Sequence, residues 1–292
     1  MIEPVDFYSN PATRIDNHYQ QSTTLFSPAE IQEEALGEFR GLRALLEKHG
    51  VQVQVFKDVA GNDTPDSIFP NNWFSTHADS ILVLYAMRAE SRRRERRADI
   101  VAWLRERYSR VVDFSLYEKQ GLFLEGTGSL VLDRVNRLAY ANLSPRTDEK
   151  LVDRWAGEFS FKAIKFRACD MQGRAIYHTN VMMSIGSEFA VVSLESVKKE
   201  EEREVLRRSL LDTGHQVIEI NPRQVGQYCG NMLELSPAGK ERVIVMSSHA
   251  YRHFEKRQLD RLQRFGRIIC TDLSTIEMIG GGSARCMLAE LF

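Results

Sequence analysis

The feature that most constrains the fold of this 292-residue chain is a set of polar corners that recur at a regular interval. Each corner follows a helix-like and then a strand-like segment, precedes a pair of strands, and lies roughly 50 to 60 residues from the next corner. The corners carry Asp66–Asn72, Glu125–Ser129, His178–Asn180, Cys229–Asn231 and Gly280–Cys286. Such units arranged radially predict a five-bladed α/β propeller with pseudo-fivefold repeats, in which the corners meet at the axis.

Hydrophobic periodicity locates the elements of each unit. Helices are expected at 29–49, 91–108, 148–159, 198–213 and 251–265, and a strand after each of them at 51–56, 110–114, 161–166, 216–220 and 267–271. The last unit is truncated at Phe292, so we expect a strand near Pro4–Tyr8 to complete it. An open doubly wound sheet would also alternate strands with helices, but it needs no fivefold period and no GxGxxG sequence follows the first strand.

Composition narrows the class of partner. Lys and Arg total 39 and Asp and Glu total 40, a balance that argues against nucleic acid and makes a small molecule the expected partner. No long apolar run or signal peptide is present, so we expect one catalytic domain over residues 1–292 in the cytoplasm, with no membrane contact. A homodimer stays open. The basic cluster at 92–97 is expected to be the solvated first turn of a helix.

The corners bring together residue types that suit covalent catalysis. A thiolate is a strong nucleophile, but a free thiol is mostly protonated at neutral pH and needs a neighbouring base or cation. Cys286 can be the nucleophile, His178 its acid–base partner and Glu125 the group that orients the imidazole. Cys229 also lies on a corner, and local sequence alone leaves it as an alternative. The four cysteines form no CxxC pair, and we expect no metal or cofactor.

Four motifs, in chain order at the corner spacing, resemble a known superfamily. Glu125-Gly126-Thr127-Gly128 resembles an EGGD element, Ser144-Pro145-Arg146-Thr147 an SxRT loop, His178-Thr179-Asn180 an HxD element, and Gly280 to Cys286 a terminal GGGxxxC motif. These are motifs of the arginine deiminase and amidinotransferase superfamily, whose proteins share the pentein fold. The resemblance covers the whole chain and implies that Cys286 is the nucleophile and that Arg146 binds the substrate carboxylate.

Two departures from that pattern bear on the substrate. The run Asp66 to Asn72 resembles a DxxFxxD element whose last acid binds a guanidinium, but here that acid is replaced by Asn72, and the acid of HxD is replaced by Asn180. An amide offers a donor and an acceptor, which suits a neutral ureido group better than an all-donor guanidinium. Gly128 replaces the last acid of EGGD as a further departure. With FPNNWF at 69–74, EGTGS at 125–129 and SARCM at 283–287, the sequence looks most similar to the branch described as citrulline-utilisation hydrolases.

The sequence therefore predicts a C–N bond hydrolase that converts citrulline to ornithine, carbon dioxide and ammonia through a thioester. Asn72 and Asn180 would hold the ureido group and Asp66 the α-ammonium group, and Asn71 is a further substrate-binding candidate. An arginine deiminase, a dimethylarginine hydrolase and an amidinotransferase would share the same trio, and a catalytically silent pentein binding module would lack it. Two features stay open: the role of Arg285, either a surface side chain or a cation beside the thiol, and that of the loop at 10–20.

Overall fold

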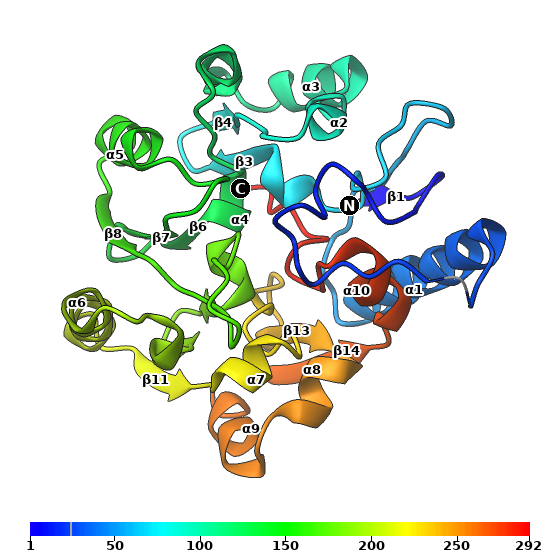
Figure 1. Cartoon of the computed structure of the whole chain (residues 1–292). Helices are drawn as coiled ribbons and strands as arrows, with labels where there is room; N and C mark the ends of the chain where they lie inside the picture. Colours follow the sequence, from blue (N-terminus) through cyan, green and yellow to red (C-terminus); the bar gives the residue numbers. More distant parts are fainter. Residues whose placement is uncertain (24) are drawn as a thin grey trace.

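The computed structural model describes residues 1–23 and 25–292, whose strands form five small sheets. Four sheets have three strands and the fifth has two. The sheets are arranged radially about an axis, and most of the helices lie at the rim (Figure 1). The fold is thus the α/β propeller that the corner spacing predicts. Among the described residues, no helix is both long and apolar enough to cross a membrane.

The four larger sheets share one topology. An inner strand, which directly follows a corner, pairs antiparallel with a middle strand, and the outer strand pairs parallel with the middle one. In the order inner, middle, outer, the strands are β3 (Phe74–His77), β4 (Ile81–Leu84) and β5 (Arg110–Asp113); β6 (Leu130–Asp133), β7 (Leu138–Asn142) and β8 (Lys162–Phe166); β9 (Met183–Ile185), β10 (Phe189–Val192) and β11 (Gln216–Glu219); β12 (Leu233–Leu235), β13 (Val243–Ser247) and β14 (Arg267–Thr271). Helices connect each parallel pair, as a parallel crossover requires.

Three of the five predicted helices are continuous: α1 (Pro28–Lys48), α5 (Glu149–Glu158) and α6 (Glu200–Asp212). The other two predictions are wrong as single helices. The first divides into α2 (Glu90–Arg93) and α3 (Ala98–Arg105), and the second into α8 (Ser248–His253) and α9 (Lys256–Leu262). In the second, Glu255 forms a capping box with Gln258, which starts a new helix after the extended residue Phe254.

The fifth sheet closes the ring, but not as predicted. Its strands are β1 (Ile2–Glu3) and β2 (Phe56–Lys57), so the expected strands at 4–8 and 51–56 are mostly wrong. Residues 51–55 do alternate between half-buried and exposed, as an extended segment does. The hydrogen-bonded strand pair begins only where the N-terminus meets this segment, at Gln54, whose carbonyl oxygen accepts a hydrogen bond from the Met1 ammonium at 2.9 Å. Alternation of burial predicts extended backbone, whereas a strand also needs a neighbour.

The corners form short helical turns near the axis. These are η1 (Pro70–Asn72), α4 (Gly126–Ser129) and η3 (Thr179–Val181), and α4 contacts both of the others. Gly126 has φ +49°, and a Cβ at this position would lie 2.3 Å from Asn71 O. Glycine is therefore required for η1 and α4 to approach one another. The remaining short elements are η2 (Ser115–Gln120), η4 (Leu194–Ser196), α7 (Pro222–Val225) and α10 (Ser274–Gly280).

Helix α1 fixes the segment that leads to Cys286. Its apolar face buries five side chains. Burial of each of the larger ones stabilises the fold by roughly 1.5–3 kcal/mol. The five are Ile31, Ala35, Phe39, Leu42 and Leu46. From the same helix, both carboxylate oxygens of Glu38 accept backbone N–H groups at the start of α10, from Thr275 at 2.7 Å and Ile276 at 2.9 Å. The glycine run that precedes Cys286 thus begins at an anchored helix.

Candidate active site

The three residues of the predicted catalytic trio lie on corners and are almost completely buried. Glu125 is 0% exposed, His178 1% and Cys286 4%. Glu125 precedes α4, His178 precedes η3, and Cys286 follows the glycine run. Each trio member therefore comes from a different corner of the propeller, as the repeat requires.

Two asparagine amides contact the Cys286 sulfur. Asn180 Nδ2 lies 3.4 Å from Sγ and Asn231 Nδ2 lies 3.1 Å from it. The orientation of the Asn231 amide is fixed, because its Oδ1 accepts the Arg285 N–H at 3.1 Å while its Nδ2 donates to Asn180 O at 3.0 Å. Asn231 therefore presents a donor to the sulfur, which suits a thiolate.

The glycine run packs against an aromatic ring. A Cβ at Gly280 or at Gly282 would lie 2.8 Å from an atom of the Phe69 ring. Beyond the glycines, Ser283 Oγ donates to the buried carboxylate of Glu277 at 2.5 Å, and Ser283 O accepts the Cys286 N–H at 3.0 Å. The backbone that carries the thiol is thus held on both sides, by Phe69 and by Glu277.

The pair formed by Glu125 and His178 defines the state of the imidazole. Burial alone would raise the pKa of Glu125, but Arg146, His178 and Arg92 outweigh it and hold that pKa well below its usual range. The ionised Glu125 Oε2 lies 2.9 Å from His178 Nε2, so Nε2 carries the proton. Burial lowers the pKa of His178 despite Glu125, which leaves a neutral imidazole whose Nδ1 can accept a proton.

His178 Nδ1 faces Gly128. A Cβ at that position would lie 2.7 Å from Nδ1 and 2.3 Å from Asn72 Nδ2. Any side chain would therefore fill the space that these two nitrogens share. This explains physically why the aspartate of an EGGD element is absent here.

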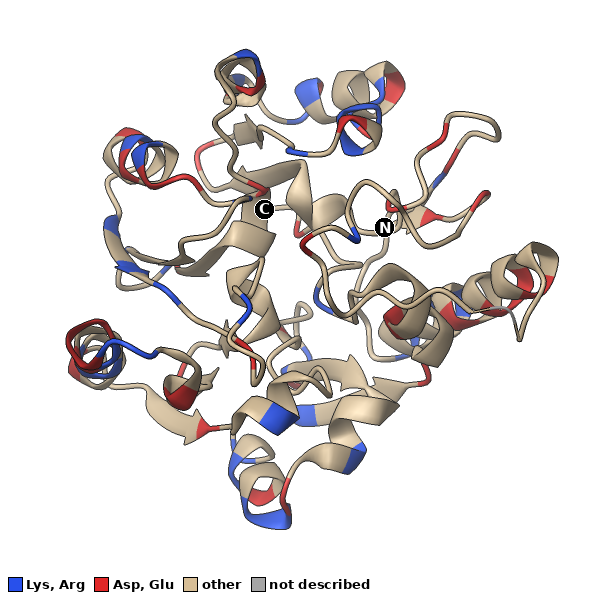
Figure 2. Cartoon of the chain, viewed as in Figure 1, with Lys and Arg blue, Asp and Glu red and all other residues tan. Residues whose placement is uncertain are grey.

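Most charged residues lie on the outer helices and loops (Figure 2). Arg92 belongs to helix α2 but is only 2% exposed, so the prediction that residues 92–97 form a solvated turn is wrong for this residue. Its guanidinium bonds both carboxylate oxygens of Glu95 at 2.8 and 2.9 Å and donates to Asn72 Oδ1 at 2.6 Å. Arg92 thereby fixes the amide of Asn72, with Nδ2 directed away from the guanidinium.

The second buried arginine, Arg146, meets a carboxylate from the N-terminal loop. Arg146 Nε donates to Asp16 Oδ1 at 2.9 Å, Arg146 Nη2 donates to the same oxygen, and Arg88 Nη1 donates to Asp16 Oδ2. Arg146 also lies 3.5 Å from Glu125 and over the Tyr177 ring. Two guanidinium groups converging on one carboxylate form a clamp of the kind that binds carboxylate ligands.

The loop at 10–20 covers these side chains. Asn10 Nδ2 and Thr13 Oγ1 each donate to Asp66 Oδ2 at 2.9 Å, while Thr13 O accepts from Arg146. Asn17 and Gln20 donate to the carbonyl of Gly280. The loop therefore joins the Asp66 corner, the Arg146 clamp and the glycine run.

Four buried polar atoms at the corners have no hydrogen-bond partner within the described residues. These atoms are Asp66 Oδ1, Asn71 Oδ1, Asn72 Nδ2 and Asn180 Oδ1. Buried polar groups are seldom left unpaired, because each one costs free energy. Three acceptors and one donor are thus directed at what the site would bind. The described residues include no group of His, Cys, Asp and Glu arranged to hold a metal ion.

Cys229 and Arg285, the two remaining candidates from the sequence, contact groups other than the Cys286 sulfur. Cys229 is fully buried in the hydrophobic core, where its thiol contacts Ala250 O, and burial raises its pKa to about 12. Arg285 is 8% exposed, and its guanidinium bonds Leu288 O at 2.8 Å and Glu290 at 3.2 Å. Arg285 is therefore turned toward the C-terminal segment and is not a surface side chain.

Comparison with known sequences decides the family. The sequence model of the family described as N,N dimethylarginine dimethylhydrolase, eukaryotic, matches residues 3–292. The chain belongs to this family. It is thereby a member of the pentein superfamily of guanidino-modifying proteins, as its motifs indicate. No curated protein matches the sequence.

Solved structures share the fold at low sequence identity. The apo structure of ArgZ, an arginine dihydrolase from the ornithine-ammonia cycle in cyanobacteria, has a TM-score of 0.77 and 16% identity; the match covers 100% of this chain but 40% of ArgZ. The N-terminal domain of ArgZ(N71S), covalently bound to a reaction intermediate, has a TM-score of 0.75 and 17% identity, with 99% and 95% of the two chains covered. A dimethylarginine dimethylaminohydrolase adduct has a TM-score of 0.63 and 15% identity, with 88% and 90% covered.

Four residues of the site escaped the sequence argument: Asp16, Arg88, Arg92 and Asn231. Asn231 lies on a predicted corner, but only the nearby thiol of Cys229 was considered as a functional group of that corner. The position of Asn231 on a corner, at the inner end of a blade, is the sequence feature that could have identified it. Asp16 lies in the loop at 10–20, whose role the sequence left open, while Arg88 and Arg92 lie outside the corners and are identified only by their contacts in the folded chain.

Proposed function

We propose that this protein is a cofactor-independent cysteine hydrolase, of the citrulline-utilising kind, that converts citrulline to ornithine, carbon dioxide and ammonia. Residues 1–292 form a single catalytic domain, and the trio is Cys286, His178 and Glu125. Family membership supports a hydrolase that acts on guanidino or related groups. The choice of a neutral ureido substrate depends on the asparagines.

The observation that carries this choice is the fixed amide of Asn72. Arginine can only donate hydrogen bonds, so Arg92 Nη1 at 2.6 Å requires the oxygen of Asn72, and the unpartnered Nδ2 remains for the ligand. A guanidinium carries donors alone and offers Nδ2 no acceptor. A ureido group has one C=O for Nδ2, and its N–H groups suit the free oxygens of Asn71 and Asn180.

The other end of the substrate is an α-amino acid. The α-carboxylate replaces Asp16 between Arg146 and Arg88, since the clamp already holds a carboxylate. Asp66 receives the α-ammonium group, because Thr13 joins Asp66 to Arg146 and places the two charges side by side. This pairing gives each charge of the substrate a partner of opposite sign.

The chemistry proceeds in two steps. His178 Nδ1 takes the thiol proton as Sγ attacks the ureido carbon, and the same proton passes to the δ-nitrogen, so that ornithine leaves and a carbamoyl thioester remains. His178 then takes a proton from water, the hydroxide adds to the thioester carbon, and the C–S bond breaks. Carbamic acid forms beside Cys286 and decomposes there to carbon dioxide and ammonia, while the proton returns to the sulfur. The amides of Asn180 and Asn231 stabilise the thiolate whenever it forms.

A guanidine hydrolase is the second candidate, and a specific observation favours it: the family is named for dimethylarginine, and ArgZ is an arginine dihydrolase. An amidinotransferase or a silent binding module has no comparable support. The deciding assay incubates the purified protein separately with citrulline, arginine, dimethylarginine and agmatine, and measures ammonia, ornithine and citrulline. We expect ornithine from citrulline, lost in Cys286→Ser. Turnover of arginine or dimethylarginine with no action on citrulline would contradict the proposal.

The Asn72→Asp variant tests directly whether the fixed amide of Asn72 selects the substrate. A carboxylate would accept from Arg92 with one oxygen and offer the other to a guanidinium. We expect the ratio of kcat/KM for citrulline to that for arginine to fall by at least tenfold, or about 1.4 kcal/mol. Asn71→Asp is the matched control, because no arginine fixes that amide. An unchanged ratio in Asn72→Asp would show that this residue does not select the substrate.

A further inference from the structure

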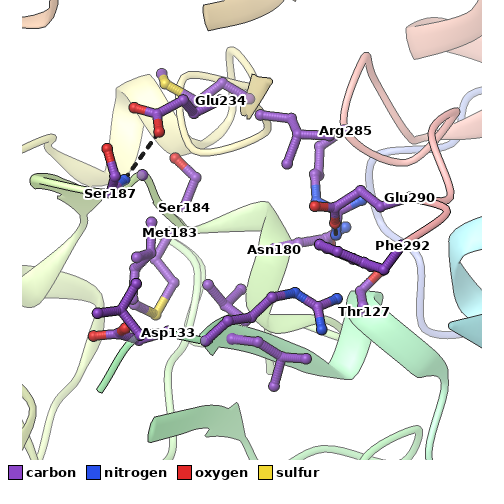
Figure 3. A pocket seen from close by; sticks show the side chains of 18 residues that line it. Thr127, Asp133, Asn180, Met183, Ser184, Ser187, Glu234, Arg285, Glu290 and Phe292 are labelled. Atoms are coloured by element: carbon purple, nitrogen blue, oxygen red, sulfur yellow. Dashed lines mark hydrogen bonds and ion pairs between the residues drawn. The ribbon is translucent and has the colours of Figure 1, made fainter. Parts of the chain in front are cut away.

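A cavity of about 180 Å³ lies behind the corners. Its walls are the inner strands β6, β9 and β12 with the C-terminal segment that contains Arg285, Glu290 and Phe292, and Thr127 and Asn180 line it as well. Figure 3 shows these side chains around a common space, with Glu234, Ser184 and Ser187 on one side and Arg285 and Glu290 on the other. We call this space the rear cavity.

The rear cavity is separated from the nucleophile by the thickness of one amide. Asn180 lines the cavity, and its Nδ2 lies 3.4 Å from Cys286 Sγ. Thr127 also lines it, and its hydroxyl bonds Asn71 of the neighbouring corner at 3.3 Å. The Asn180 side chain therefore contacts both the nucleophile and the rear cavity.

Three polar side chains of the rear cavity each have a buried oxygen without a partner among the described residues. The atoms are Asn180 Oδ1, Ser184 Oγ and Glu234 Oε2, and the first two residues are 1% and 6% exposed. The other oxygen of Glu234 accepts the Ser187 N–H at 3.1 Å. All three unpartnered atoms can accept, and one belongs to a carboxylate. These atoms would suit a small cationic ligand that only donates hydrogen bonds.

The other charged groups of the cavity are engaged elsewhere. Arg285 pairs with Glu290 at 3.2 Å, and Asp133 accepts from both nitrogens of Asn136 at 2.9 and 2.8 Å. Arg134 bonds the ring nitrogen of His77 at 2.9 Å and lies over the Phe292 ring at 4.1 Å. Glu234 therefore supplies the lining carboxylate with a buried, unpartnered oxygen, while Arg134 adds a positive charge to the same lining.

We propose that the rear cavity is an ammonium site through which the small product leaves, separately from the amino acid. The inference rests on the proposed function, because decomposition of carbamic acid yields ammonia next to Cys286, and ammonia takes a proton from water to become ammonium. The loop at 10–20 covers the substrate clamp on the other side of the corners. Ammonium, with four N–H donors and one positive charge, suits the oxygens of Ser184 and Glu234, and Asn180 Oδ1 becomes free to join them once the ureido group that it holds has been consumed.

The first test measures binding without turnover. Thermal unfolding of the Cys286→Ser variant is followed while ammonium chloride is raised at constant ionic strength against sodium chloride or tetramethylammonium chloride. We expect a saturable rise of the midpoint with ammonium alone, lost in the double variant with Glu234→Gln, which keeps the shape and removes the charge. An equal rise with sodium, or a rise that persists in Glu234→Gln, would overturn the site.

The second test concerns release in the active enzyme. Ser184→Leu fills the cavity, whereas Ser184→Ala leaves its volume, so we expect kcat to fall about tenfold in the former only, with KM within twofold. Glu234→Gln should weaken the inhibition of turnover by ammonium at least fivefold. This second variant tests the site even if Ser184→Leu does not fold. Ammonium-specific stabilisation without citrulline turnover would support the site and contradict the proposed substrate. Citrulline turnover without that stabilisation would overturn the site and leave the proposed function standing.

Discussion

The regions around the two buried arginines differ in how their guanidinium groups are satisfied. Arg92 is bound by Glu95, three positions away on its own segment, and by Asn72 and the backbone oxygens of Asp66 and Phe69 on the neighbouring corner. Arg146 is bound by Asp16, which comes from a loop 130 residues earlier and is shared with Arg88. The first arginine is saturated by the fold and acts by orienting an amide. The second has a partner that a substrate carboxylate can replace.

The largest expected effect tests the structural role of Arg92. Arg92→Met leaves Glu95 as a buried charge without its partner, so we expect unfolding to become easier by about 3–5 kcal/mol. Urea denaturation measures the change. The double variant with Glu95→Gln removes both charges and should recover most of the loss. If Arg92→Met alone is as stable as the parent protein, Arg92 is not a structural arginine.

The next effect tests whether Arg146 binds the substrate. Arg146→Lys keeps the charge but loses the two-pronged geometry, and we expect KM for the amino acid to rise about 100-fold, or about 2.7 kcal/mol, while stability changes little. Arg88→Lys is the matched variant. Because the Arg88 side chain is 37% exposed and that of Arg146 only 3%, its KM should rise less. A normal KM in Arg146→Lys would place the carboxylate elsewhere.

A smaller effect of opposite sign is expected at Asp16. Asp16→Asn removes the charge that competes with the substrate carboxylate, so KM should fall about tenfold if displacement costs about 1.4 kcal/mol. Steady-state kinetics with citrulline measures it, and Asp6→Asn, on the same N-terminal segment, is the control. A higher KM would mean that Asp16 contacts the substrate rather than competing with it.

The smallest effect is on pH dependence. Burial lowers the pKa of His178, and Arg146 and Arg92 lower it further against the opposing Glu125, so the imidazole stays neutral below the ordinary value of about 6.5. Loss of a nearby cation should raise that pKa. We expect the acid limb of kcat/KM to move to higher pH by less than about one unit in Arg146→Gln and to stay in place in Arg88→Gln. A shift to lower pH would contradict this account.

The sequence predicted the parts of the site that depend on the repeat. The corners with Glu125, His178 and Cys286 follow from regular spacing. The structure brings the turns that follow Glu125 and His178 into contact, and Asn180 of the second turn contacts Cys286 Sγ. The sequence failed where a role depends on one partner in space. Arg92 lies in a charged run that is typical of a solvated helix start, and its burial depends on Asn72, which belongs to another corner. Val51 to Val55 alternate like a strand, but the chain offers them no adjacent ladder.

The fixed amide of Asn72 also has a consequence for how such proteins diversify. Asparagine and aspartate codons differ by a single base, and Arg92 accepts either side chain at the same oxygen. One point mutation therefore exchanges a donor for an acceptor without disturbing the fold around it. Under the proposed role of Asn72, a gene of this kind lies one nucleotide from the opposite preference, and substrate class would change within a lineage faster than overall sequence similarity indicates.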